Sequence, residues 1–250
     1  MLKQILTIGQ LFLLTCISVG QVNPTPGLAD EFKRIGATAN SKLQHGEMFQ
    51  GFTSSYVQGS QFFNPEWAGG YIITSANQVV RDSSFQYKFD KLRHELFISV
   101  KTDDGSEPIH VMAADKNQIR SFVLISDDTH VFEPGRNFGA DSPQDFYEVL
   151  ARKDSGFTLL KYVKSKFVKY DVSDLTRMKR GDVFDEYIDK ISYYICFKTA
   201  KPQLVSFRER SVLNILPDSK KPIAEDYFLN NRDKEENDNF LILLVNALNK

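Results

Sequence analysis

Alternating apolar and polar side chains mark the middle of the chain as strand-forming. In residues 85–90 three aromatic side chains alternate with polar or charged ones, and residues 96–100 repeat the same period of two. Successive side chains of a strand point to opposite faces, so this period predicts strands that bury one face and expose the other. The Asp103-Asp104-Gly105 sequence that follows is typical of a hairpin turn.

Further strand-like segments follow at intervals of about ten residues, separated by Gly, Asp and Ser. They are residues 108–113, 119–126, 130–133, 146–151, 157–168, 191–198 and 203–207. Short strands at regular spacing favour an antiparallel arrangement. We therefore expect an α+β protein that is mainly antiparallel β, as a meander, a sandwich or an open barrel, with a short helical C-terminal segment.

The hydrophobic period changes near the C-terminus. Residues 211–216 end at Pro217, residues 222–229 begin with a proline, and residues 240–248 carry apolar side chains at 240, 241, 244 and 248. Proline disrupts the interior of a helix but is tolerated in its first turn. The spacing of residues 240, 241, 244 and 248 places their apolar side chains on one helical face. We expect helices within residues 208–250 to pack on a β domain formed by residues 62–207.

The first twenty residues have the layout of a secretory signal peptide. Lys3 precedes a mostly apolar run, residues 5–19, which ends at Ser18-Val19-Gly20. The run is shorter than the roughly 20 apolar residues of a membrane-spanning helix. We expect cleavage before Gln21, export, and no transmembrane span in the mature chain.

A lipid anchor is the alternative fate of the same segment. Leu13-Leu14-Thr15-Cys16 is similar to a bacterial lipoprotein sequence, although Thr15 departs from the small residue usual before the lipidated cysteine. The protein is accordingly expected in the periplasm or in association with the outer membrane, with Cys16 as the anchor in the second case. Residues 21–61 show no clear period and are expected to be flexible or weakly helical.

Composition narrows the class of protein further. The 31 basic and 32 acidic residues give a net charge of −1, which argues against a nucleic-acid partner. After cleavage Cys196 is the only cysteine, so an intramolecular disulfide is excluded and a packed core must provide the stability. About 230 residues can bury roughly 70–75% of their unfolded surface, which suffices. Cys196 itself lies in a strand-like run and is expected to be buried.

One segment combines basic and aromatic side chains. Residues 161–180 contain seven basic and two acidic residues, a local charge of +5, whereas residues 225–238 have a local charge of −4. The basic segment is interpreted as a docking face for an envelope protein or for an anionic glycan or lipid surface. The alternatives are a solvated strand face and pairing of the two segments with each other. The candidate docking residues are Lys161, Tyr162, Lys164, Lys166, Lys169 and Tyr170, with Trp67 as a separate candidate for stacking on a ligand.

Motifs for catalysis and cofactors are missing from the chain. It contains no phosphate-binding loop, no dinucleotide fingerprint and no Gly-x-Ser-x-Gly elbow, and we expect no cofactor and no metal. The histidines are expected to be separate surface or rim residues. Acid–base chemistry leaves no local signature, so a carboxylate pair drawn from Asp104, Asp128, Glu133 and Glu148 keeps glycan hydrolysis open.

Several short motifs carry a resemblance. They are Trp67-x-x-Gly70, Gln86-Tyr-Lys-Phe-Asp90, Glu95-Leu-Phe97, Asp115-Lys116, Ile119-x-x-Phe122 and Phe146-Tyr-Glu-Val-Leu150. In these the chain resembles a group of uncharacterised exported proteins of Bacteroidota, over about residues 62–250. The resemblance implies export and an antiparallel β fold, and it implies no catalytic residue.

Together these observations predict an exported cell-envelope protein with a non-enzymatic binding or scaffold role. One alternative is an exported hydrolase that acts on glycan or peptide with Asp and Glu as acid and base. The other is a structural envelope component without a small ligand. Exposed aromatic side chains or an open strand edge would favour the binding protein.

Overall fold

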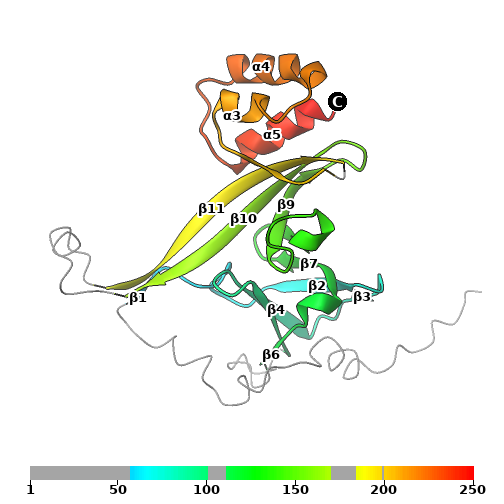
Figure 1. Ribbon diagram of the computed structural model, residues 1–250. Helices are drawn as coiled ribbons and strands as arrows, with labels where there is room; N and C mark the ends of the chain where they lie inside the picture. Colours follow the sequence, from blue (N-terminus) through cyan, green and yellow to red (C-terminus); the bar gives the residue numbers. More distant parts are fainter. Residues whose placement is uncertain (1–56, 101–110, 170–183, 199) are drawn as a thin grey trace, which may run out of the picture.

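The computed structural model describes residues 57–100, 111–169, 184–198 and 200–250 (Figure 1). Within these ranges the chain forms two β-sheets and a C-terminal group of helices. The expected signal peptide, Cys16, Asp104 and Tyr170 lie outside the described residues. The predicted fold class, α+β with mainly antiparallel strands and a short helical C-terminal segment, is confirmed.

The larger sheet has the strand order β1-β11-β10-β9-β8-β7-β2-β3, and β12 pairs with β11. Its strands are β1 (Val57–Gln58), β2 (Gly69–Thr74), β3 (Val79–Val80), β7 (Ile119–Ile125), β8 (Thr129–Pro134), β9 (Phe146–Arg152), β10 (Phe157–Val168), β11 (Asp185–Phe197) and β12 (Gln203–Val205). From β7 to β11 consecutive strands pair antiparallel, as in a meander. The short β1 pairs parallel with the start of β11.

The smaller sheet packs on one end of the larger sheet. It consists of β4 (Phe85–Asp90), β5 (Glu95–Val100) and β6 (Val111–Ala113). Phe89 lies at the centre of this contact, with ring centroids 5.5 Å from Phe122, 5.0 Å from Phe132 and 6.0 Å from Phe146. These rings belong to the first hydrophobic core, which joins the two sheets.

Gly70 allows the backbones of β2 and β7 to approach each other closely at the start of β2. Gly70 has φ +156°, and a Cβ atom at this position would clash with the carbonyl oxygen of Val123 in β7. At the neighbouring Gly69 the nearest atom, the carbonyl oxygen of Ile125, would lie 3.6 Å from such a Cβ atom. The pairing of β2 with β7 therefore requires glycine at position 70 but not at position 69.

The C-terminal helices cover the other end of the larger sheet. They are α3 (Glu209–Leu213), α4 (Lys221–Asn230) and α5 (Asp238–Leu248). Asn237 caps α5 by accepting a 3.2 Å hydrogen bond from the Phe240 main-chain N–H. The apolar face of α5 packs with Leu159 and Ile195 in the second hydrophobic core. No helix of the described residues has the length and apolar content that crossing a membrane requires.

Both cores lie on the same face of the larger sheet. On β9, Phe146 belongs to the first core and Leu150 packs against the second, and Glu148 lies between them on the same face. Glu148 is bonded to His130, and the neighbouring Lys161 forms an ion pair with Asp238 of α5. We call these four residues the polar row. The opposite face carries a small third cluster around Tyr147, Leu160 and Cys196.

The structure differs from the sequence-based expectations in three places. Val57 and Gln58, expected in a loop, form β1 because they pair with Asp185 and Glu186. β11 begins at residue 185, not at 191, although its first half has no buried face. His94, expected at the surface or rim, is buried in the turn before β5 with φ +53°.

Candidate functional site

The long hairpin of β10 and β11 separates the candidate docking residues onto two faces. Its strands extend from the helices to β1 (Figure 1). Because side chains alternate along a strand, Tyr162, Lys164 and Lys166 share one face of β10, and Lys161 points to the opposite face. There its Nζ lies 2.5 Å from Asp238 Oδ2. This contact joins the basic segment to the acidic one, as one of the alternatives expected.

Lys164, Lys166 and Lys190 form what we call the lysine face of the hairpin. Lys190 of β11 is the direct cross-strand partner of Lys164, and Lys166 is the next residue on the same face of β10. Lys164 Nζ lies 3.7 Å from Asp145 Oδ2, and its side chain is 52% exposed. Like charges directly opposite each other on neighbouring strands are unfavourable, so this face is suited to an acidic partner.

Trp67 and Lys169 lie apart from this face. Trp67 precedes β2 and is half-buried, with Nζ of Lys88 on β4 5.6 Å from its ring centroid. Lys169 follows the last residue of β10 and is exposed. The structure thus brings together Tyr162, Lys164 and Lys166 from the candidate set, and it does not place Trp67 on the hairpin.

Tyr162 is occupied by contacts inside the protein. Its hydroxyl donates a 2.7 Å hydrogen bond to Asp145 Oδ2, and its ring stacks on His94 with centroids 4.9 Å apart. Burial raises the pKa of the Tyr162 hydroxyl, and the hydrogen bond to Asp145 adds to this effect. We therefore regard Tyr162 as a supporting residue under the lysine face.

His94 is buried, contrary to the expected rim position. Its side chain packs between Phe89 and Tyr162, and its Nδ1 accepts a 3.3 Å hydrogen bond from the Phe146 main-chain N–H. Burial lowers the pKa of His94 to about 4, with the charge of Lys164 acting in the same direction and Asp145 opposing it. His94 is thus neutral at physiological pH.

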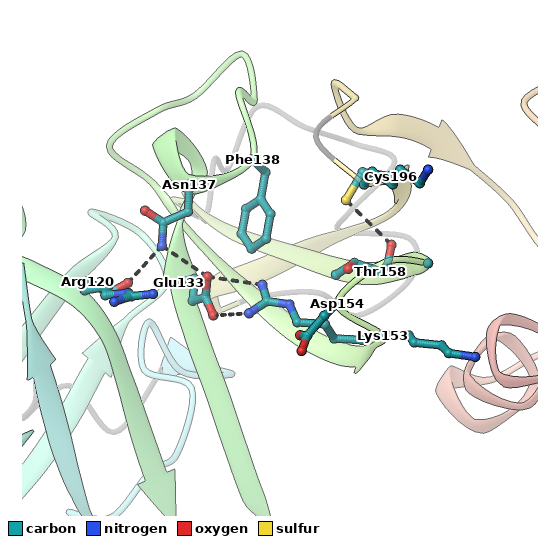
Figure 2. A pocket seen from close by; sticks show the side chains of 11 residues that line it. Arg120, Glu133, Asn137, Phe138, Lys153, Asp154, Thr158 and Cys196 are labelled. Carbon is teal, nitrogen blue, oxygen red and sulfur yellow. Dashed lines mark hydrogen bonds and ion pairs between the residues drawn. The ribbon is translucent and has the colours of Figure 1, made fainter. Parts of the chain in front are cut away.

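A pocket of about 420 Å³ opens at the other end of the same face (Figure 2). It is lined by residues from β7 to β11 and from the turns beside them: Arg120, Glu133, Asn137, Phe138, Arg152, Lys153, Asp154, Gly156, Thr158, Cys196 and Lys198. The Phe138 ring projects toward the space between Glu133 and Cys196 (Figure 2). Distant parts of the chain thus meet in one polar hollow.

An ion pair in this pocket fixes its single half-buried acid. Arg152 donates two hydrogen bonds to Glu133, of 2.7 and 3.1 Å, and Asn137 Nδ2 donates a third, of 3.1 Å, to the same carboxylate (Figure 2). A bidentate arginine contact of this kind is strong and directional. Glu133 therefore serves to hold Arg152 and Asn137 in place.

Cys196 lines the pocket as a buried thiol, as expected for this position. It is 3% exposed, and its Sγ lies 3.8 Å from the Thr158 carbonyl oxygen. Burial raises the pKa of the Cys196 thiol. A nucleophilic cysteine needs the opposite change, because the thiolate is the reactive form.

The candidate carboxylates for hydrolysis do not face a common gap. Glu133 and Glu148 lie on adjacent strands, where they are paired with Tyr147 and Phe132, and they point to opposite faces of the sheet. Glu148 Oε1 lies 2.7 Å from His130 Nδ1. A glycosidase requires two carboxyl groups flanking one bond, about 5–10 Å apart. Asp128 lies at the exposed turn between β7 and β8.

Sequence reasoning missed Lys190 and the whole pocket. Lys190 could have been predicted as part of this face, because antiparallel pairing of residues 157–168 with the following strand places a lysine opposite Lys164. The pocket had no local signal, since its residues come from positions 120 to 198. Among the described residues no group of three or more His, Cys, Asp or Glu side chains is arranged to hold a metal ion.

Comparison with known proteins leaves the family undetermined. No protein-family model, no curated protein and no solved structure matches the chain. The function must therefore be argued from the site itself.

Proposed function

We propose that the protein is an exported, non-enzymatic binding protein of the cell envelope. In this proposal its hairpin holds an extended, acidic segment of a partner protein along the edge of β11. The observation that carries the proposal is an open strand edge beside the lysine face.

The edge is open over the middle of β11. On the outer side of this strand, β1 pairs with Asp185 and Glu186, and β12 pairs with residues 193–195. Gly59, after β1, still lies beside the Tyr187 carbonyl, and residues 188–192 have no neighbouring strand among the residues that the structure describes. The free N–H and C=O groups of a strand edge can hydrogen-bond an added strand, which is a recurrent mode of peptide recognition.

The positive charge of the lysine face favours an acidic partner segment. Glu186 is the only acid that β10 and β11 place on the lysine face, against Lys164, Lys166 and Lys190. The central acid of β11, Asp189, points to the opposite face, where it is bonded to Lys91 at 2.5 Å. An added strand with acidic side chains on the lysine face therefore gains favourable pairs.

Apolar side chains extend the complementarity. Ile188 is 46% exposed on the lysine face, and Ile191 is 49% exposed on the opposite face. A partner strand that alternates acidic and apolar residues can contact lysines with one side and Ile191 with the other. This pattern defines the expected sequence of the partner segment.

Binding of a synthetic peptide with alternating Glu and Val tests the proposal. Fluorescence anisotropy of the labelled peptide is expected to show binding to the full chain. The triple variant Lys164→Glu, Lys166→Glu and Lys190→Glu should weaken it at least about ten-fold, because it reverses the charges that face the peptide.

Two controls separate strand addition from general charge attraction. An equal charge change at Arg232, Lys234 and Lys250, exposed residues of the C-terminal helical region, should leave the affinity unchanged. A peptide with N-methylated amides keeps its carboxylates but loses its N–H donors, and it should bind poorly. Equal binding of the methylated peptide, or no binding of the parent peptide, would contradict the proposal.

Export is the second half of the proposal and rests on the N-terminal segment. Intact mass of the protein from an envelope fraction should correspond to a chain that begins at Gln21, or at a lipidated Cys16 in the anchored alternative. A mass that begins at Met1 would rule out both forms of processing.

A further inference from the structure

The edge of β11 presents the main-chain groups of Asp189 and Ile191 outward. In an antiparallel pair, two opposite residues exchange both main-chain hydrogen bonds or neither, and the two kinds of pair alternate. The Ser165 N–H donates a 3.2 Å hydrogen bond to the Lys91 carbonyl, so its cross-strand partner Asp189 directs its own N–H and C=O away from β10. Ile191, two residues further, does the same. The Tyr187 carbonyl agrees with this alternation, because it faces the residue after β1 on the outer side.

Neighbouring segments limit the open edge at both ends. Gly59 lies beside Tyr187 at one end, and β12 pairs from Tyr193 onward at the other. Among the described residues this leaves an open stretch of residues 188–192, roughly 16 Å at the rise of a strand. Within it, an added strand can reach four main-chain groups, the N–H and C=O of Asp189 and of Ile191.

Side-chain contacts hold this part of β11 in its strand conformation. Asp189 Oδ2 lies 2.5 Å from Lys91 Nζ, and Asp189 Oδ1 accepts a hydrogen bond from the Ser165 hydroxyl. All residues of the open stretch also pair with β10. A binding edge that is already extended loses less conformational entropy when a partner associates.

The positions of the four groups favour an antiparallel segment. An antiparallel strand places two residues directly opposite Asp189 and Ile191, and these make all four hydrogen bonds in the middle of the open stretch. A parallel strand needs residues opposite Ile188 and Ser192 for the same four bonds, at the ends of the stretch beside Gly59 and β12. Antiparallel pairing is also slightly more stable per residue.

We infer that the partner segment carries a directional four-residue motif, apolar–acidic–small polar–apolar, which pairs antiparallel with residues 191, 190, 189 and 188 in that order. The inference rests on the proposed strand addition and gives it a direction and a register. The acidic residue lies opposite Lys190, an exposed lysine without an ion pair among the described residues. This is a pair without main-chain hydrogen bonds, in which the two side chains lie closest.

The other three positions follow from the side chains of β11. The two apolar residues of the motif contact Ile191 and Ile188, which are 49% and 46% exposed. The small polar residue lies opposite Asp189, whose carboxylate is already bonded to Lys91. An acidic residue at this position would meet a like charge directly opposite, which is unfavourable. The motif therefore cannot be reversed without loss.

Two labelled peptides of equal composition test the direction. One carries Val-Glu-Thr-Val and the other the reversed Val-Thr-Glu-Val, each between Gly-Ser flanks. Fluorescence anisotropy with the full chain should show at least about five-fold tighter binding of Val-Glu-Thr-Val. The reason is that the antiparallel register places the glutamate of the reversed peptide opposite Asp189 instead of Lys190.

Single N-methyl groups on Val-Glu-Thr-Val test the register. In the antiparallel register the N–H of the threonine points to β11, and the N–H of the glutamate points away. Methylation of the threonine amide should weaken binding at least about ten-fold, because it removes a hydrogen bond and places a methyl group against the strand. Methylation of the glutamate amide should change the affinity by less than about two-fold.

Lys190→Glu tests the central charge pair. This variant should prefer Val-Lys-Thr-Val to Val-Glu-Thr-Val, the reverse of the wild-type preference, because the charges opposite each other are exchanged. Lys166→Glu is the matched control, since Lys166 lies on the same face but its cross-strand partner is Ile188. It should keep the wild-type preference. Circular dichroism of both variants verifies that the fold is retained.

The outcomes separate this inference from the proposed function. Equal or tighter binding of the reversed peptide, equal loss from the two methyl groups, or an unchanged preference in Lys190→Glu would overturn the motif and leave strand addition in place. Failure of every peptide to bind, the alternating Glu and Val peptide included, would overturn strand addition and the motif with it.

Discussion

His94 shows how strongly its neighbours determine the properties of a single side chain. It is 1% exposed, stacks on Tyr162, and has an Nε2 atom without a hydrogen-bond partner among the described residues. Sequence reasoning expected it, like the other histidines, at the surface or the rim. Its burial depends on Tyr162, which is 68 residues away in sequence, so no local pattern could reveal it.

The pH dependence of stability should report on His94. Its pKa is about 4 in the folded protein and about 6.5 when unfolded, so the unfolded chain binds more protons between these values. The contribution of His94 to stability is therefore present above pH 6.5 and is lost as the pH falls toward 4, by up to about 1.4 kcal/mol per pH unit.

Urea unfolding of the wild type and of His94→Asn between pH 4.5 and 7.5, an interval of about 3 units, measures this effect. Asparagine retains tolerance of the positive φ at this position. The free energy of unfolding should fall less steeply with acidification in the variant than in the wild type. Parallel curves for the two proteins would show that His94 does not titrate in this range.

At the scale of elements, most of the strands could be predicted from the local sequence. Alternation or short apolar runs between turn residues located β4, β5, β7, β8, β9 and β10 to within one or two residues, because each of these strands contains buried side chains. The first half of β11 was not predicted, since residues 185–190 have no buried side chain. The candidate site was predictable to the same extent. Lys164 and Lys166 follow from alternation, whereas the pocket requires the pairing of five strands.

The pairing of β2 with β7 leads to a stability prediction. Gly70→Ala places a methyl group against the Val123 carbonyl and should destabilise the protein by about 1–3 kcal/mol, the usual cost of overpacking. Gly69→Ala is the matched control, because its methyl group meets only the Ile125 carbonyl at 3.6 Å. Thermal unfolding monitored by circular dichroism should show a clear decrease in Tm for Gly70→Ala and a smaller change for Gly69→Ala. Equal changes would mean that β2 can shift away from β7.

At the scale of the whole molecule, one large sheet carries two separate surface features. The open edge and the lysine face lie on the half of the hairpin toward β1, and the pocket lies on the half toward the helices. Hydrophobic periodicity could predict the strands and the C-terminal helices. It could not predict that both hydrophobic cores share one face, because this depends on the positions of Phe146, Glu148 and Leu150 relative to layers that come from distant parts of the chain.

The polar row between those cores has a consequence for how the molecule comes apart. His130, Glu148, Lys161 and Asp238 interrupt the apolar contact, so the described residues form no continuous hydrophobic layer between the small sheet and the helices. Cooperative units of native-state opening tend to coincide with such separately packed regions. We expect two foldons, one centred on β4 and β5 and one on α4 and α5.

Amide hydrogen exchange read by mass spectrometry can resolve them. Leu244→Ala, in the core beneath the helices, should cost about 2–5 kcal/mol and accelerate exchange in α4 and α5 while β4 and β5 keep their protection. Leu96→Ala should do the reverse. Uniform acceleration in both variants would show a single cooperative unit.

If the two units open separately, loss of the helical layer would leave the small sheet and its aromatic core folded, and a protease could remove the helices from an otherwise native molecule.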